Sequence, residues 1–248
     1  SAEGLLHDLR TWRQGWLDSG EWPVFELGQG DRGSQFLLPD KLYGRETEIA
    51  TINGIYDRAV RGEIVLCMVG GYSGIGKSAL VRAMRAHVIA DAGSLIEGKF
   101  DQYHRETPYS ALIEAFKSLL RQVLAGTRHD VEAWRAKVEA TLGENASVVI
   151  DVLPELQRLI GAKPPAPVLG GSAAQQRFNA VFSQLLKLFA SREHPLVMFL
   201  DDLQWADFAS LALIKTFVRE GEGAHLLMVG AYRDNEVLIK VKAAGVCG

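Results

Sequence analysis

The stretch VGGYSGIGKSALV, residues 69–81, joins an apolar run to a glycine-rich loop that ends in Lys and Ser. The apolar run, EIVLCMVGG at residues 63–71, is typical of a strand buried on both faces of a parallel sheet. After the loop, apolar residues recur at helical spacing, at Leu80, Val81, Met84 and Val88. The sequence therefore predicts a strand, a tight loop and a helix in succession, which is how a βαβ unit begins.

The loop fits the pattern GxxxxGK followed by Ser or Thr, from Gly71 through Gly76, Lys77 and Ser78. Gly71, Gly74 and Gly76 would let backbone N–H groups approach and wrap a phosphate. Lys77 would reach the β- and γ-phosphates of a nucleotide, and the Ser78 hydroxyl would bind Mg²⁺. A chance glycine turn is the alternative. The strand before the loop and the helix after it favour a phosphate-binding loop.

A second apolar run ends in two acidic residues within PLVMFLDDLQWAD, residues 195–207. Because the carboxyl ends of parallel strands meet at one edge of a sheet, we expect these carboxylates beside the loop. Asp201 is the candidate for the metal, acting through water, and Asp202 could orient or deprotonate the attacking water. A solvated loop carboxylate is the alternative for Asp202. Asp207, three residues before Ser210, is typical of a helix N-cap.

A cation is expected at the same edge of the sheet. Arg233 directly follows the apolar stretch LLMVGAY, residues 226–232. A positive charge at this position can report the nucleotide state and stabilise the transition state of phosphoryl transfer at the γ-phosphate. Arg233 is therefore a candidate catalytic residue, and an ordinary surface arginine is the alternative.

The composition limits the possible classes of protein. The 248 residues are 48% hydrophobic and 23% charged, with a formal net charge of -3, which is ordinary for a soluble globular protein. This balance offers no basic excess for a nucleic-acid partner. No apolar run approaches the roughly 20 residues that span a bilayer, and the first ten residues lack the pattern of a signal peptide. Cys67 and Cys247 form neither a disulfide framework nor a metal-ligand spacing, so we expect a cytoplasmic protein without a membrane partner.

Patterns along the chain divide it into three parts. Residues 1–40 contain a helix, with Leu5, Leu9, Trp12 and Trp16 at helical spacing, and then a connector rich in Gly, Pro and Asp. Residues 41–237 alternate helices and strands, with a second strand expected from Ser94. Residues 238–248 carry no interpretable fold signal. The prediction is an α/β fold, a P-loop NTPase core with a parallel sheet flanked by helices and an N-terminal helical connector.

One motif upstream of the loop points to a family. LYGRETE, residues 42–48, resembles the hhGRxxE motif of STAND signalling NTPases, an AAA-related class of ATP-driven switches. MFLDDLQWAD and GAYRDNEV resemble the metal-binding and arginine-bearing strands of that class. The resemblance implies that Arg45 lies beside the nucleotide and helps to bind it.

Four stretches narrow the resemblance. KLYGRE, GKFDQY, PPAPVLGGSAAQQRFN and LDDLQWAD together resemble the AAA ATPase module of large bacterial signalling kinases. In those proteins a serine/threonine-kinase-like domain precedes the module, and sensor and histidine-kinase domains follow it. The resemblance, over roughly residues 36–237, implies ATP and Mg²⁺ as ligands, slow hydrolysis, and a nucleotide-dependent switch that controls attached signalling domains. Kinase activity would then lie outside this chain.

The resemblance also bears on the two ends of the chain. Residues 1–16 resemble the last helix of a kinase C-lobe, so the chain is expected to be a fragment of a longer protein. An independent N-terminal helix is the alternative. Members of the class continue into a helical lid and a winged-helix domain, whereas this chain stops after EVLIKVKAAGVCG, residues 236–248.

Three other functions remain open at this point. A non-hydrolysing scaffold would hold ATP or ADP structurally. A DNA-loading ATPase of the origin-recognition type shares the core, but the acidic net charge argues against it. A small-molecule kinase is a weaker alternative without an identifiable acceptor motif. His104 is the one histidine in a plausible site loop, and a surface or packing role is favoured for it.

Overall fold

The computed structural model describes residues 2–20, 44–103, 107–167, 170–220, 223–234 and 240–245. Contacts divide the chain into two compact units, residues 1–41 and residues 42–248. In the first unit, α1 (Ala2–Ser19) is a continuous helix, as the spacing of its apolar residues predicts. The expected connector lies outside the described residues. No helix in the described ranges is long and apolar enough to cross a membrane.

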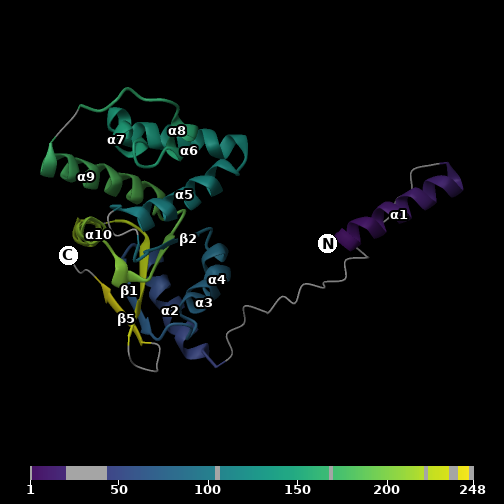
Figure 1. Ribbon diagram of the computed structural model, residues 1–248, viewed down its shortest axis with the longest axis horizontal. Helices are drawn as coiled ribbons and strands as arrows, with labels where there is room; N and C mark the ends of the chain where they lie inside the picture. The colour runs from purple at the N-terminus through teal and green to yellow at the C-terminus, as the bar shows by residue number, and fades with distance from the viewer. Residues whose placement is uncertain are drawn as a thin grey trace. The chain divides into compact units, whose positions relative to one another are not determined.

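The second unit is built on a five-stranded sheet with the order β2-β3-β4-β1-β5 (Figure 1). Its strands are β1 (Ile64–Gly71), β2 (Ser94–Lys99), β3 (Leu196–Asp201), β4 (Leu226–Arg233) and β5 (Lys240–Gly245). The first four strands are parallel, whereas β5 runs antiparallel to β1. The carboxyl ends of the four parallel strands therefore meet at one edge of the sheet, where such sheets bind their ligands.

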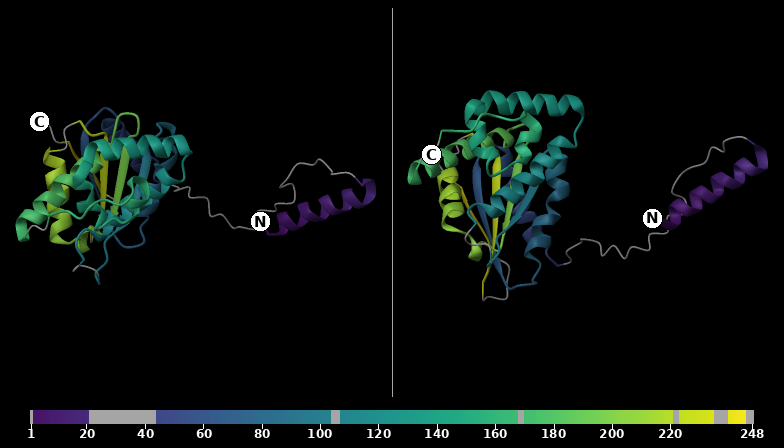
Figure 2. Two further views of the ribbon diagram at one scale, coloured as in Figure 1. Left: turned by 90° about the horizontal axis from the view of Figure 1, so that it is seen from above. Right: turned by 45° about the horizontal axis from the view of Figure 1, so that its top comes forward.

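Each face of the sheet packs against its own set of helices (Figure 2). Side chains alternate between the faces, so that in β3 Met198 and Leu200 join one core while Val197 and Phe199 join the other. One face is covered by α2 (Glu46–Val60), α3 (Lys77–Ala83) and α4 (Arg85–Ala90). The other is covered by α5 (Ser110–Leu124), α9 (Gly171–Phe189) and α10 (Phe208–Glu220). Burial on both faces explains the continuous apolar runs of the sequence.

A group of short helices lies between α5 and α9 in the sequence and extends the core on that side. Its members are α6 (Arg128–Leu142), the 3₁₀ turn η1 (Gly143–Asn145), α7 (Ala146–Ile150) and α8 (Glu155–Ile160). Aromatic contacts join α9 to two other helices on this side, with Phe116 of α5 against Phe182 of α9 and Trp134 of α6 stacked on Phe189 of α9. Helix α6 begins with a capping box in which Thr127 and Asp130 satisfy each other's backbone N–H groups.

Two glycines allow other elements to lie directly on the sheet. A Cβ on Gly98 of β2 would collide with the backbone of Ala111 in α5. A Cβ on Gly230 of β4 would collide with the side chain of Leu203, in the 3₁₀ turn η2 (Leu203–Trp205) that follows β3. The second contact seats the turn after the acidic pair against β4, which brings the ends of β3 and β4 together.

The expected parallel sheet flanked by helices is confirmed, with one addition. Strand β5 lies within residues 238–248, for which the sequence predicted no element. Residues 240–245 pair with β1 along 65–70, so β5 occupies the edge that β1 would otherwise expose.

Candidate functional site

A cavity of about 290 Å³ opens at the carboxyl edge of the parallel strands. Residues from the glycine-rich loop and from the ends of β2, β3 and β4 line it: Ser73, Gly74, Gly76, Lys77, Ser78, Ala79, Lys99, Asp201, Asp202 and Arg233. Three cationic side chains and two carboxylates are among these ten residues. The lining therefore carries a positive balance, which favours an anionic ligand.

The loop between β1 and α3 has the backbone conformation that its glycines predict. Gly74 and Gly76 have φ angles of 80° and 101°, in the left-handed region that side-chain-bearing residues rarely adopt. Gly76 directly precedes α3. Gly71 ends β1, and its carbonyl group faces the loop, where it accepts a hydrogen bond from Lys77.

Lys77 folds back over the loop. Its side chain is 8% exposed, and its Nζ donates hydrogen bonds to the carbonyl oxygens of Gly71 and Tyr72, both at 2.8 Å. Burial lowers the pKa of Lys77, while the negative charges of Asp201 and Asp202 act in the opposite direction. The Lys77 ammonium group therefore lies at the cavity wall and contacts two neutral carbonyl oxygens. A negatively charged phosphate would be a stronger acceptor for it.

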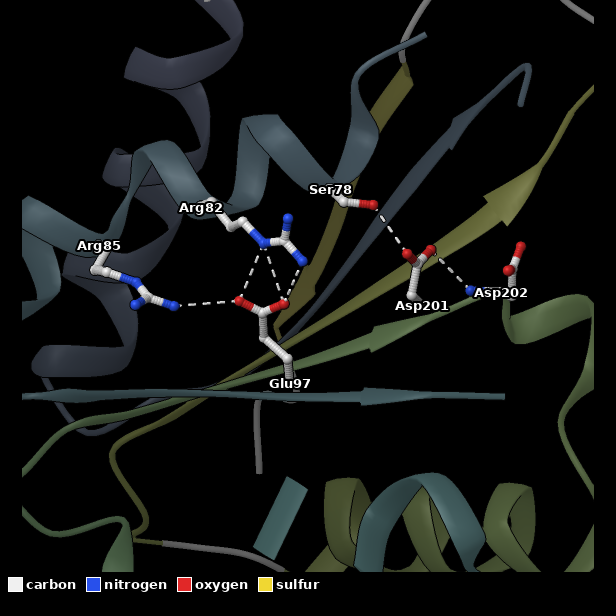
Figure 3. Close-up of polar contacts among 6 residues, drawn as sticks. All are labelled: Ser78, Arg82, Arg85, Glu97, Asp201 and Asp202. Atoms are coloured by element: carbon white, nitrogen blue, oxygen red, sulfur yellow. Dashed lines mark hydrogen bonds and ion pairs between the residues drawn. The ribbon is translucent and has the colours of Figure 1, made fainter. Parts of the chain in front are cut away.

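Ser78 and Asp201 meet across the cavity (Figure 3). The Ser78 hydroxyl, at the start of α3, donates to Asp201 Oδ2 over 2.8 Å, and the backbone N–H of Asp202 donates to Asp201 Oδ1 over 2.9 Å. A hydroxyl and a carboxylate are hard oxygen ligands, the type that Mg²⁺ prefers. The pair fits the magnesium site predicted from the sequence. Across the described ranges, no group of three or more His, Cys, Asp and Glu residues is arranged to hold a metal.

Helices α3 and α4 are anchored to the edge strand β2 beside this pair (Figure 3). Glu97 of β2 accepts hydrogen bonds from Arg82 of α3, at 2.9 Å for the closest nitrogen, and from Arg85 of α4, at 3.3 Å. These contacts connect the helix that follows the loop to the strand that carries Lys99.

Asp202 lies at the centre of a second set of contacts. Its backbone is left-handed, with φ 55° and ψ 44°, a conformation that Asp adopts more readily than most residues. Lys99 Nζ lies 3.5 Å from Asp202 Oδ2, and Arg233 Nε lies 3.6 Å from Oδ1. The amide nitrogen of Gln204 donates to the same Oδ1 over 2.7 Å. The Asp202 carboxylate is therefore held from three directions at the edge of the cavity.

Arg233 ends β4, where it is paired with Gly71 of β1. Its side chain is half-exposed, and its backbone N–H donates to Gln204 Oε1 over 3.2 Å. Lys99 and Gln204 were missed as site residues in the sequence, although both lie in stretches, GKFDQY and LDDLQWAD, that carry the family resemblance. The available signal was a lysine at the end of a strand for Lys99, and an amide in the turn after the acidic pair for Gln204.

Arg45 is not among the residues that line the cavity. It directly precedes α2, and its Nη1 forms an ion pair with Glu48 Oε1 at 2.8 Å. Its contact with a nucleotide stays a prediction, and the two residues before Gly44 in the motif lie outside the described residues. His104 also lies outside them.

The N-cap predicted at Asp207 is confirmed. The backbone N–H of Ser210 donates to Asp207 Oδ1 over 2.8 Å, and the Ser210 hydroxyl donates to Oδ2 over 2.5 Å. Asp207 therefore stabilises the start of α10 and is not among the residues that line the cavity.

Comparison with known proteins shows which family the chain is similar to. Residues 41–229 match the family model of the AAA ATPase domain. The chain is similar to hybrid signal transduction histidine kinase G of Dictyostelium discoideum, with 35% identity over 191 residues, which is 77% of this chain and 6% of the relative. It is also similar to histidine protein kinase 1 of Candida albicans, with 26% identity over 249 residues, 86% of this chain and 10% of the relative.

The chain thus spans one tenth or less of the length of either relative. The family model, in contrast, covers most of the chain and includes the loop, the acidic pair and all six helices that cover the two faces of the sheet. The chain therefore belongs to the AAA ATPase domain family.

Proposed function

We propose that this chain binds ATP with Mg²⁺, hydrolyses it slowly, and acts as a nucleotide-dependent switch of the STAND type within a multi-domain signalling kinase. The observation that carries the proposal is the convergence of Lys77, Ser78, Asp201, Asp202 and Arg233 on one cavity. The names of the two relatives, both histidine kinases, support the signalling context. The bacterial origin, the cytoplasmic location and the division into residues 1–40, 41–237 and 238–248 stay predictions.

Binding would begin with the loop. The positive φ angles of Gly74 and Gly76 would let backbone N–H groups of the loop point toward the phosphates. The ammonium group of Lys77 would leave its two carbonyl acceptors and bind phosphate oxygens instead. Ser78 and Asp201 would hold Mg²⁺, which when bound neutralises charge on the β- and γ-phosphate oxygens. The positive balance of the lining supports this choice of ligand.

Hydrolysis would require a positioned water. The water oxygen forms a bond to the γ-phosphorus, the bond from this phosphorus to the β,γ-bridging oxygen breaks, and ADP and inorganic phosphate result. Asp202 would orient the water and accept its proton. Arg233 would stabilise the negative charge on the γ-phosphoryl oxygens. Both side chains lie at the same wall of the cavity, with Arg233 Nε 3.6 Å from Asp202 Oδ1.

A non-hydrolysing scaffold is a second candidate, favoured by one observation. The Asp202 carboxylate is already engaged by Lys99, Gln204 and Arg233, so fewer of its lone pairs are available to a water molecule. A steady-state phosphate-release assay separates the two functions. Release that depends on Mg²⁺ and ATP supports the switch, and binding without release supports the scaffold.

Binding of a fluorescent ATP analogue, with and without Mg²⁺, tests the first step of the proposal, which is nucleotide binding. We expect binding to the wild-type chain and loss of binding in Lys77→Ala, because the buried ammonium group is the main phosphate-facing charge of the loop. Lys163→Ala is the matched control, since Lys163 pairs with Glu139 and is absent from the cavity lining. Undiminished binding by Lys77→Ala, or no binding by the wild-type chain, would contradict the proposal.

A further inference from the structure

Gln204 connects the two residues to which the proposed function gives catalytic roles. It lies in η2, two residues after Asp202 and far from Arg233 in the sequence. Both the nitrogen and the oxygen of its side-chain amide form hydrogen bonds. The nitrogen donates to Asp202 Oδ1 over 2.7 Å, and the oxygen accepts from the backbone N–H of Arg233 over 3.2 Å. A neutral side chain with one donor and one acceptor end is suited to such a bridge.

The contact with Arg233 follows from where β3 ends. The pairing of β3 with β4 stops at Leu200 and Gly230. Beyond it, the N–H of Asp234 donates to Gly71 of β1, so the N–H of Arg233 points to the opposite side, toward the position that β3 has left. Gln204 Oε1 supplies an acceptor there and takes the place of the missing strand.

The contact with Asp202 adds a short hydrogen bond to the two longer ion pairs of its carboxylate. Lys99 and Arg233 lie 3.5 and 3.6 Å from the Asp202 carboxylate, which are ion-pair distances without a short hydrogen bond. The 2.7 Å contact from Gln204 is the shortest of the three and selects the direction of Oδ1. Because Gln204 is neutral, it orients the carboxylate without adding a charge beside it.

We infer that Gln204 is a positioning residue that couples the end of β4, at Arg233, to the Asp202 carboxylate. The inference rests on the proposed function. A displacement of Arg233 toward a γ-phosphate moves its backbone N–H, and Gln204 transmits that movement to Asp202. Asp202 is then oriented for proton transfer when a γ-phosphate engages Arg233, although Gln204 itself lines no part of the cavity.

Two substitutions separate the ends of the bridge. Gln204→Glu keeps an acceptor for the Arg233 N–H but removes the donor to Asp202 and sets two carboxylates against each other at neutral pH. Gln204→Met keeps the length of the side chain and removes both contacts. Gln157→Met is the matched control, because Gln157 lies exposed in α8, away from the cavity.

Kinetics form the first readout. We expect kcat to fall about tenfold or more in both Gln204 variants, with KM for ATP changed by less than about threefold, because positioning acts on the proton-accepting step. A purely structural role would instead change KM for ATP or the stability of the fold together with kcat.

Amide hydrogen exchange at Arg233, without nucleotide, forms the second readout. Exchange should be slow in the wild-type chain and in Gln204→Glu, and faster in Gln204→Met, whereas the neighbouring β4 amides should not change. This pattern supports the bridge even where a variant is inactive. It also indicates whether Gln204→Met remains folded.

Different results would contradict the role of Gln204 and the proposed hydrolysis. Unchanged exchange at Arg233 in Gln204→Met, or wild-type kcat in Gln204→Glu, would overturn the inference. A wild-type chain that binds ATP without turning it over would overturn the proposed hydrolysis instead. In that case faster exchange at Arg233 in Gln204→Met still supports the bridge, and unchanged exchange overturns it.

Discussion

The Ser78 hydroxyl donates a hydrogen bond to the Asp201 carboxylate over 2.8 Å, although 123 positions separate the two residues in the sequence. The contact joins the first turn after the glycine-rich loop to the end of β3. It places a hydroxyl and a carboxylate together, as the proposed magnesium site requires, with the hydroxyl for direct contact and the carboxylate for contact through water.

Magnesium dependence is the first prediction from this pair. With Asp201 acting through a metal-bound water, Asp201→Asn should weaken Mg²⁺–ATP binding by about 10–100-fold. Ser78→Ala should act in the same direction. The affinity for ATP in EDTA should stay near the wild-type value for both variants, because the loop and Lys77 contact the phosphates directly. Titration of a fluorescent ATP analogue at several Mg²⁺ concentrations measures this, and equal losses with and without Mg²⁺ would contradict it.

Asp202→Asn tests whether the Asp202 carboxylate accepts the proton of the attacking water. The amide has nearly the same shape but cannot accept a proton, so we expect ATP affinity to remain and phosphate release to fall by about 100-fold. Asp207→Asn is the matched control from the same segment, because Asn also serves as an N-cap and Asp207 does not line the cavity. Turnover by Asp202→Asn at the wild-type rate would remove Asp202 from the mechanism.

The loop, β1 and β3 could be predicted because their signals are local. Glycine spacing and uninterrupted apolar runs follow from burial on both faces of the sheet, and they stand next to one another in the sequence. The placement of Arg233 at the same edge as the acidic pair followed from the parallel topology alone.

The parts that could not be predicted depend on distant neighbours. Strand β5 alternates lysine with apolar residues only over residues 240–243, and its pairing depends on the free edge that β1 offers. Gln204 is an ordinary polar residue until the end of β3 leaves the N–H of Arg233 without a strand partner. Lys99 enters the site because β2 ends level with Asp201, a register that no local pattern encodes.

Cys67 provides a prediction about reactivity. The side chain is fully buried between β1 and the α2–α4 face, and burial raises the pKa of the Cys67 thiol to about 12. Because the thiolate is the reactive form, Cys67 should not react with a thiol reagent between pH 7 and about pH 9 in the folded chain. In Cys247→Ser, where Cys67 is the sole cysteine, labelling should appear only after unfolding in urea. Labelling of the folded variant at the rate of the unfolded chain would contradict the burial.

Gly98 and Gly54 provide a matched pair for stability. In Gly98→Ala the new Cβ meets the backbone of Ala111, and a helix backbone cannot move aside as a flexible side chain can, so we expect a loss of about 1–3 kcal/mol. Gly54 lies within α2 with open space around it. Gly54→Ala should therefore stabilise the protein by about 0.5–1 kcal/mol, because alanine is the better helix former.

Urea unfolding followed by circular dichroism measures both changes against the wild-type chain. Opposite signs are the expected result, because the two substitutions add the same methyl group to different surroundings. Equal stability of Gly98→Ala and Gly54→Ala would mean that α5 does not lie directly on β2. The close approach would then not set the position of Lys99 at the adjacent end of that strand.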